Sequence, residues 1–145
     1  MSSGKIIAVC TSTRKGVPKS DVGSGLLEEG HGLRGDAHAG DWHRQVSLLS
    51  SEQIATMKDK GLVVKAGSFA ENLTTEGFDL DSVQVGDRLK VGKSAILEVT
   101  QIGKECHTRC AIYNKIGECI MPERGVFARV TKGGEVAAGD PIELV

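Results

Sequence analysis

Short apolar runs separated by polar, glycine-containing stretches dominate this chain. The first run, Ile6 to Val9, is continuous rather than alternating, which predicts a strand over residues 5–11 that is buried on both faces. Residues 12–25 are mostly polar and include Gly16 and Pro18, so they predict an extended, mobile loop. Weak alternation from Leu26 predicts a strand before Gly30, and residues 45–49 predict another.

One segment predicts a helix. Ser50 can cap its N-terminus, and Gln53 lies three residues further on, as a capping box requires. Apolar Ile54 and Met57 then follow at helical spacing, and Gly61 is a typical terminator. We therefore expect a helix from about residue 51 to residue 60.

From Leu73 onward the pattern is typical of β-structure. The segment 80–83 leads into a strand predicted over 85–92, and further strands are predicted over 95–102 and over 136–145. Two of these begin with the same device, a Gly-Asp turn, at Gly86-Asp87 and at Gly139-Asp140. The pattern predicts a mostly β fold with a few short helices (α+β), either a barrel or a compact sandwich. No linker is visible, so one domain over residues 1–145 is expected.

Composition excludes several function classes. The 145 residues carry a net charge of -1, and only 3% are aromatic. Neither a phosphate-neutralising field nor a base-stacking surface is expected, so we predict no nucleic-acid partner. No segment is long and apolar enough for a membrane span or a signal-peptide core, which predicts a cytoplasmic protein with no membrane partner and with reduced thiols. Oligomeric state cannot be predicted from these features.

The densest chemistry lies in residues 103–110, where Cys106 has Lys104, His107 and Arg109 as neighbours. Cations favour the thiolate, the reactive form of cysteine, so Cys106 is a candidate nucleophile or sulfur carrier. Three alternatives remain: a Cys/His-ligated metal site that also uses Cys110 and Cys119, a redox pair, and inert buried thiols.

A second polar cluster occupies residues 30–45. Its candidate metal or anion ligands are Asp36, His38, Asp41, His43 and Arg44. Three or four converging ligands favour a metal, whereas arginine and glycine backbone N–H groups favour an oxyanion. A plain polar turn is the third alternative. In a further segment, residues 67–75, Glu71 and Asn72 either orient a polar ligand or hold the chain around Phe69 and Leu73.

Several of these segments together resemble the MOSC domain, a family named for the C-terminal domain of molybdenum cofactor sulfurases. The resemblance rests on residues 32–40 (GLRGDAHAG), 44–49 (RQVSLL), 69–74 (FAENLT), the Val85-Gly86-Asp87 turn, and the cysteine that follows residues 101–103. Each motif alone is weak evidence for the resemblance, but the order and spacing of all of them together are specific to the family. The chain resembles a small, stand-alone member, and the resemblance covers nearly all of it.

The resemblance implies a MOSC-type β-barrel and a role with molybdenum or tungsten cofactors. It implies that Cys106 carries sulfur as a persulfide, as a sulfur transferase acting with a separate cysteine desulfurase or a molybdoenzyme partner. The cofactor is expected to be molybdopterin or molybdate/tungstate, with no pyridoxal phosphate in this chain. The residues expected to bind the cofactor are Arg34, Asp36, His38, Arg44, Glu71, Asn72, Lys104, His107 and Arg109.

Two alternatives to the sulfur carrier stay open. The chain is either a non-catalytic module that delivers cofactor or oxyanion, or a protein with a metal ligated by cysteine and histidine. The resemblance also suggests a hydroxylamine-reducing activity with a partner reductase, which no residue here specifies.

Overall fold

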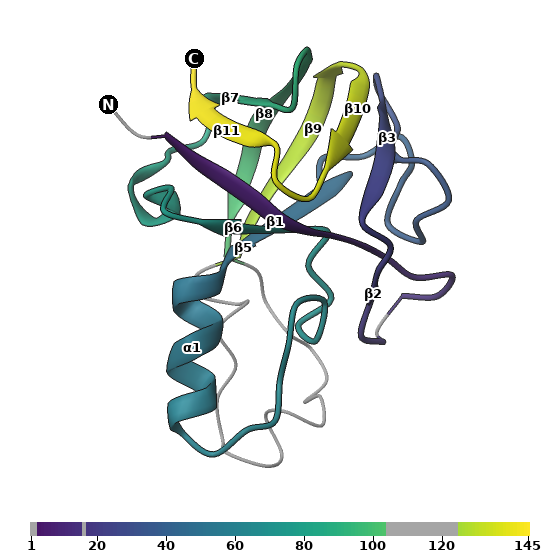
Figure 1. Ribbon diagram of the computed structural model, residues 1–145. Coiled ribbons are helices and arrows are strands. Elements are labelled where there is room, and N and C mark those ends of the chain that lie inside the picture. Colours follow the sequence, from purple (N-terminus) through teal and green to yellow (C-terminus); the bar gives the residue numbers. More distant parts are fainter. Residues whose placement is uncertain (1–2, 16, 104–124) are drawn as a thin grey trace.

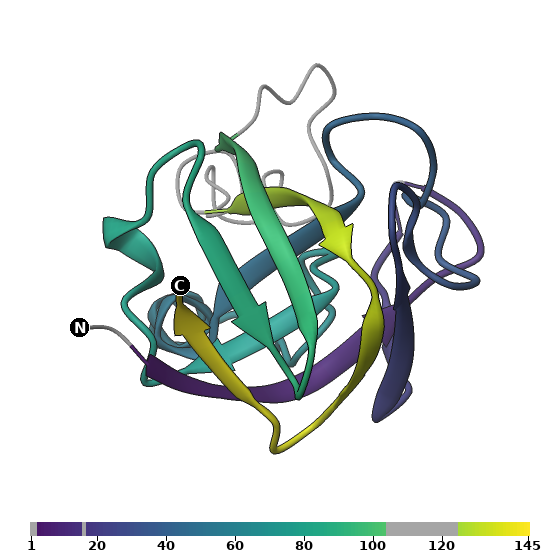
Figure 2. The ribbon, with the colours of Figure 1, turned by 90° about the horizontal axis from the view of Figure 1, so that it is seen from above.

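The computed structural model describes residues 3–15, 17–103 and 125–145. Seven strands hydrogen-bond in the order β11-β7-β8-β9-β5-β6-β1, and pairing of β1 with β11 closes them into a barrel (Figures 1 and 2). Their bounds are β1 (Ser3–Thr11), β5 (Val46–Ser50), β6 (Leu73–Glu76), β7 (Arg88–Val91), β8 (Ala95–Ile102), β9 (Val126–Lys132) and β11 (Pro141–Leu144). The barrel confirms the predicted mostly β class.

Three further strands form a small sheet beside the barrel. They are β3 (Ser24–Glu28), β4 (Gly32–Leu33) and β10 (Gly134–Ala137), in the order β10-β3-β4. A two-residue strand, β2 (Ser20–Asp21), pairs with the end of β1. The strand predicted before Gly30 is therefore confirmed. The mobile loop predicted over residues 12–25 is wrong in part, because β2 and the start of β3 lie within it.

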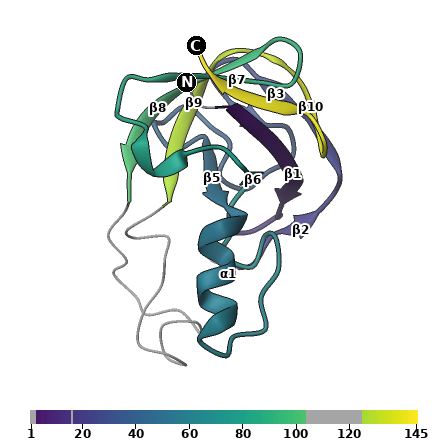
Figure 3. The same ribbon diagram turned by 60° about the vertical axis from the view of Figure 1, so that its left-hand side comes forward.

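The predicted helix is α1 (Ser51–Asp59), which projects from one end of the barrel (Figure 3). Ser50 Oγ accepts from the N–H of Gln53 at 3.1 Å, so the cap inferred from sequence is confirmed. Ile54 and Met57 pack with Leu49 and Phe127 of the barrel, which anchors the helix to it. The helix links β5 to β6, which run parallel and therefore need a crossover connection.

The barrel interior is filled by aliphatic side chains, including those of Ile6, Leu48, Leu73 and Leu97, which are fully buried. In β1, Ile6, Ala8 and Val9 are buried but Ile7 is only half-buried, so burial on both faces holds for most of the strand. The segment 80–83, read as the approach to a strand, instead contains a short 3₁₀-helix, η1 (Leu80–Ser82). Strand β9 was not singled out by the hydrophobic pattern.

Candidate functional site

A buried ion pair forms the centre of the site. Lys19 lies in the short connection before β2, and Asp36 follows β4 in the next polar loop. The Nζ of Lys19 is 2.8 Å from Oδ1 of Asp36, and neither side chain is exposed at all. Figure 1 shows the two loops side by side at one side of the barrel. Because a buried charge is costly unless it is paired, each residue requires the other.

Lys19 makes two further contacts. Its Nζ is 3.0 Å from Ser12 Oγ and 2.9 Å from Nδ1 of His38. Asp36 in turn accepts from the backbone N–H groups of Ser12 and His38, both at 3.1 Å. The pair thus binds the end of β1 to the loop that carries His38, so two distant segments converge on the imidazole.

The charge of Asp36 is stabilised by these contacts. Burial raises the pKa of its carboxyl, but Lys19, with smaller contributions from Asn72 and the Ser12 N–H, outweighs burial and leaves that pKa below its usual range. Asp36 is therefore ionised throughout the physiological range. Its negative charge offsets the positive charge of Lys19, so the pair is neutral as a unit.

A close backbone contact sets the position of Lys19. The N–H of Lys19 donates to the carbonyl of Gly67 at 2.8 Å. Gly67 has a φ of +87°, and a Cβ added there would lie 2.1 Å from the Lys19 carbonyl oxygen. Only glycine fits both conditions. The loop after α1 is consequently part of the site, because Gly67 holds the backbone of Lys19.

Glu71 is fully buried and holds this loop. It accepts from the N–H groups of Gly67 and Phe69 at 2.9 and 3.2 Å and from the Thr74 hydroxyl at 2.8 Å. Burial raises the pKa of its carboxyl, and the three donors offset that only in part. These contacts favour the structural alternative for Glu71, that it ties down the chain around Phe69.

Asn72 is also buried, and it joins three elements. Its Oδ1 accepts from the N–H of Ser47 at 2.9 Å, and its Nδ2 donates to the carbonyl of Cys10 at 3.1 Å. It also lies close enough to Asp36 to lower the pKa of that carboxyl. Asn72 is thus placed behind the ion pair, where it supports Asp36.

A cation-rich surface lies around Trp42. Its ring stacks on that of His38 with the centroids 6.4 Å apart, and its Nε1 donates to the His38 carbonyl at 2.7 Å. The charged ends of Lys15 and Arg44 each lie 4.7 Å from the indole centroid. The Nε of Arg44 is buried and has no hydrogen-bond partner in the described part of the chain. An unsatisfied, buried guanidinium N–H is a donor suited to an anionic ligand.

The other predicted residues of the two polar loops lie further out. Arg34 is largely exposed and pairs with Glu28 at 3.0 Å, on the surface. Asp41 is exposed, and His43 Nε2 is 2.8 Å from Oε1 of Gln101. Asp41 and His43 line a cavity of about 440 Å³, together with Trp42, Thr100 and Arg129. The structure therefore gathers Asp36, His38 and Arg44, and it places Arg34 and Asp41 away from their contacts.

The predicted cysteine stretch lies outside the described residues. This applies to Lys104, Cys106, His107 and Arg109, and equally to Cys110 and Cys119. The one described thiol, Cys10, is buried. Burial, reinforced by the charges of Glu71 and Asp21, raises its pKa to about 12, so Cys10 is an un-ionised thiol at neutral pH.

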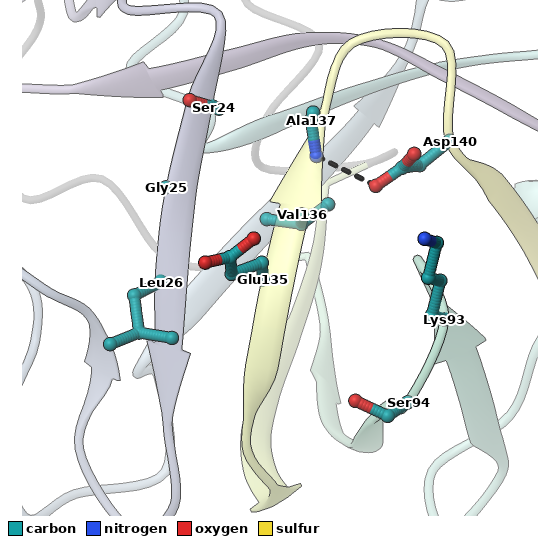
Figure 4. Close-up of a pocket in the computed structure, with 9 residues that line it drawn as sticks. All are labelled: Ser24, Gly25, Leu26, Lys93, Ser94, Glu135, Val136, Ala137 and Asp140. Carbon is teal, nitrogen blue, oxygen red and sulfur yellow. Dashed lines mark hydrogen bonds between the residues drawn. The ribbon is translucent and has the colours of Figure 1, made fainter.

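A second cavity, of about 600 Å³, lies between β10, β3 and the turn that joins β7 to β8 (Figure 4). Lys93 and Asp140 border one side of it and Glu135 the other. The carboxylate of Asp140 already accepts from the N–H of Ala137 at 2.9 Å. None of these residues takes part in the contacts around Lys19 and Asp36.

Sequence reasoning missed Lys19, Lys15 and Trp42. A lysine in a polar loop carries no local signal of burial, and its partner Asp36 is 17 residues away. Trp42 is the only tryptophan of the chain and lies inside the polar cluster, which is the one signal that pointed to it.

Two kinds of arrangement are absent from the described residues. Among them, no group of three or more histidine, cysteine, aspartate or glutamate side chains is arranged to hold a metal ion. No helix in that same part of the chain has the length and apolar character needed to cross a membrane.

Comparison with solved structures shows the same fold in several bacterial proteins. The YuaD protein from Bacillus subtilis superposes with a TM-score of 0.81 at 20% identity, over 98% of this chain and 95% of that one. YiiM from Escherichia coli gives a TM-score of 0.66 at 24% identity, over 97% of this chain and 69% of its own. YiiM from Geobacillus stearothermophilus gives 0.65 at 21% identity, over 98% and 73%.

Comparison at the level of sequence gave two results. A search of curated proteins found no match. The family model of the MOSC domain matches residues 35–143, which include Asp36, His38, Arg44, Glu71 and Asn72. With three-quarters of its length matched and the barrel in place, this chain belongs to the MOSC domain family, which is related to the C-terminal domain of molybdenum cofactor sulfurases.

Proposed function

We propose that this MOSC protein binds a molybdenum or tungsten cofactor, or the corresponding oxyanion, beside His38 and Arg44, and carries sulfur on Cys106 for transfer to the metal centre. The observation that carries the binding part is the buried Nε of Arg44, which has no hydrogen-bond partner among the residues that the structure describes. The sulfur part rests on the sequence of residues 103–110 and on the family relationship.

Charge and hydrogen-bonding capacity support an anionic ligand. Lys15 and Arg44 contribute two cations around Trp42, and the carboxylate of Asp36, next to His38, is already neutralised by Lys19. The surplus is positive. Both the phosphate of a pterin cofactor and a bare oxyanion are negative and accept hydrogen bonds, so the described residues fit either group. The bound group would supply the metal centre that accepts sulfur.

The carrier step needs a sulfur donor, and we assign that role to a cysteine desulfurase. The Cys106 thiolate attacks the terminal sulfur of the desulfurase persulfide, and a new S–S bond forms as the old one breaks. The products are a persulfide on Cys106 and a thiolate on the desulfurase, so no external oxidant or reductant is needed. Lys104, His107 and Arg109 would favour the attacking thiolate.

The sulfur part is tested by intact-mass measurement under non-reducing conditions after incubation with a desulfurase and labelled cysteine. We expect a gain of one sulfur atom that is lost in Cys106→Ser. Cys10→Ser is the matched control, and it should keep the label because the thiol of Cys10 is buried. The assignment is contradicted if the label persists in Cys106→Ser, or if it is lost instead when Cys110 or Cys119 is replaced.

The binding part is tested separately by native mass spectrometry of protein from cofactor-producing cells. We expect bound pterin, and loss of it in Arg44→Met. Retention of the pterin after all four thiols are replaced would favour the alternative, a delivery module in which Arg44 matters and the cysteines do not. That alternative is supported by the same observation on Arg44, which is independent of any thiol.

A further inference from the structure

The cavity of about 600 Å³ between β3, β10 and the turn that joins β7 to β8 is shaped by backbone contacts (Figure 4). In that turn, Gly92 has a φ of +68°, and a Cβ added to it would lie 2.6 Å from the carbonyl oxygen of Glu135. The N–H of Ala138 donates to the carbonyl of Gly23 at 2.8 Å, which joins the turn after β10 to the start of β3. The fold itself therefore fixes the walls, as is usual for small-molecule sites of this volume.

The polar side chains of this cavity are available to a ligand. The ammonium group of Lys93 and the carboxylate of Glu135 have no hydrogen-bond or ion-pair partner among the described residues. The hydroxyl groups of Ser24 and Ser94 have none there either. Asp140 has one carboxylate oxygen bonded to a backbone N–H and the other free of contacts in the same part of the chain. The cavity thus offers both donors and acceptors.

The unlike charges lie on different walls. Lys93 and Asp140 border one side of the cavity, and Glu135 lies on the other, toward β3 (Figure 4). Lys93 and Glu135 are both exposed, and they do not pair with each other. A free cation and a free carboxylate that line one cavity are complementary to a ligand that carries both charges.

An apolar surface lies beside these charges. Leu26 of β3 is opposite Glu135 of β10 in the sheet, so the two side chains share one face. The next residue of β10, Val136, points the other way and is fully buried in the core. Leu26 is half-buried and lines the cavity, so it offers an apolar contact next to the carboxylate of Glu135.

We propose that this cavity binds an α-amino acid with an apolar side chain. Glu135 accepts from the ammonium group of the ligand, Lys93 pairs with its carboxylate, and Leu26 contacts its side chain. A ligand with one charge is repelled by part of the lining, because an amine meets Lys93 and a carboxylate meets Glu135 and Asp140. The proposal does not rest on the proposed function, since this cavity shares no residue with the site around Trp42.

Titration of ¹⁵N-labelled protein with L-leucine, followed by backbone amide signals, tests the site. 4-Methylpentanoate and 3-methylbutylamine are matched probes, because each is leucine with one charged group removed. We expect leucine to shift the signals of Ser94, Glu135 and Val136 saturably, with a dissociation constant on the order of 1 mM, because exposed ion pairs contribute little. Each single-charge probe should bind about fivefold more weakly. No saturable shift of these signals, or equal binding of the three probes, overturns the proposal.

Two substitutions assign the charges. Lys93→Met should abolish the preference for leucine over 3-methylbutylamine, and Glu135→Gln should abolish the preference for leucine over 4-methylpentanoate. Lys132→Met and Glu143→Gln are the matched controls, because they remove exposed charges of β9 and β11 that do not line the cavity. All four side chains are exposed, so we expect every variant to fold. Preferences that survive both cavity substitutions, or that vanish in the controls, contradict the assignment.

Two further variants complete the test. Leu26→Ala should reduce the advantage of leucine over glycine, and an unchanged advantage contradicts the apolar contact. Arg44→Met should leave leucine binding unchanged, because Arg44 does not line this cavity. Loss of leucine binding in Arg44→Met would place the ligand elsewhere and overturn the proposal. Because leucine and the pterin cofactor are measured separately, failure of one site leaves the other standing.

Discussion

Asp140 and Asp36 have the same side chain but are held in opposite ways. Asp140 lies in a turn at the surface, where its carboxylate accepts from the N–H of Ala137, three residues earlier. Asp36 is buried and is held by Lys19 and Ser12, which are 17 and 24 residues away. The first arrangement is a property of a short peptide, whereas the second exists only when two loops meet.

The Gly-Asp turn that contains Asp140 has a second copy in the barrel, at Asp87. Asp87 accepts from the N–H of Gln84 at 2.9 Å, also three residues earlier, and the glycines that precede the two aspartates have φ values of +97° and +95°. The strands that follow the two turns, β7 and β11, are neighbours in the sheet. The same Gly-Asp sequence therefore gives the same turn geometry at both positions. The environment of Asp36, by contrast, occurs once among the described residues.

The largest expected effect comes from Lys19→Met. Removing the partner of a buried carboxylate should lower the free energy of unfolding by about 3–5 kcal/mol, measured by urea denaturation. Lys15→Met, which removes an exposed lysine of the same loop, should change it by less than about 0.5 kcal/mol. Equal losses in the two variants would contradict the special status of the buried pair.

Gly67→Ala and Gly139→Ala compare a glycine that contacts a distant segment with a glycine in a local turn. The added methyl group would collide with the Lys19 carbonyl and would occupy a left-handed conformation, so we expect a loss of roughly 2–4 kcal/mol. Gly139→Ala has the same conformational cost but nothing within 4 Å, so about 1–2 kcal/mol is expected. Thermal and chemical denaturation check the difference, which disappears if the contact with Lys19 is not maintained in solution.

The pH dependence of stability distinguishes Asp36 from surface carboxylates. Its pKa is lower in the folded protein than in the unfolded chain, so its stabilising contribution is complete above the unfolded pKa and is lost as the pH falls through the folded one. The difference in unfolding free energy between the wild type and Asp36→Asn should therefore narrow on acidification. A difference that stays constant from neutral to acidic pH contradicts the assignment.

The smallest effects are expected in the turns. Asp87→Ala and Asp140→Ala each remove one exposed or half-buried hydrogen bond, so a loss of about 1 kcal/mol is expected in each. The two values should agree, because the geometry is shared. Urea denaturation of both variants tests this, and a large difference between them would show that the turns are not equivalent.

Local sequence was sufficient for much of the fold. The cap at Ser50, the span of β8 and both Gly-Asp turns follow from neighbours within a few residues, and all are present. Strand β9 was overlooked, and the segment 80–83 contains a 3₁₀-helix. The sequence around Lys19 predicts a mobile loop, because polar residues with glycine and proline are typical of loops, whatever they pack against.

For the candidate site, the sequence by itself determined the chemical inventory: the motifs of the family, a polar cluster around Asp36, His38 and Arg44, and a cysteine among cations. It left open whether that cluster suits a metal or an anion. Tertiary structure decided which of these residues meet, because a lysine from another loop pairs with Asp36 and lies 2.9 Å from Nδ1 of His38. Burial and the pairing of charges depend on which segments meet in space, and that contact has no signature in the residues on either side of it.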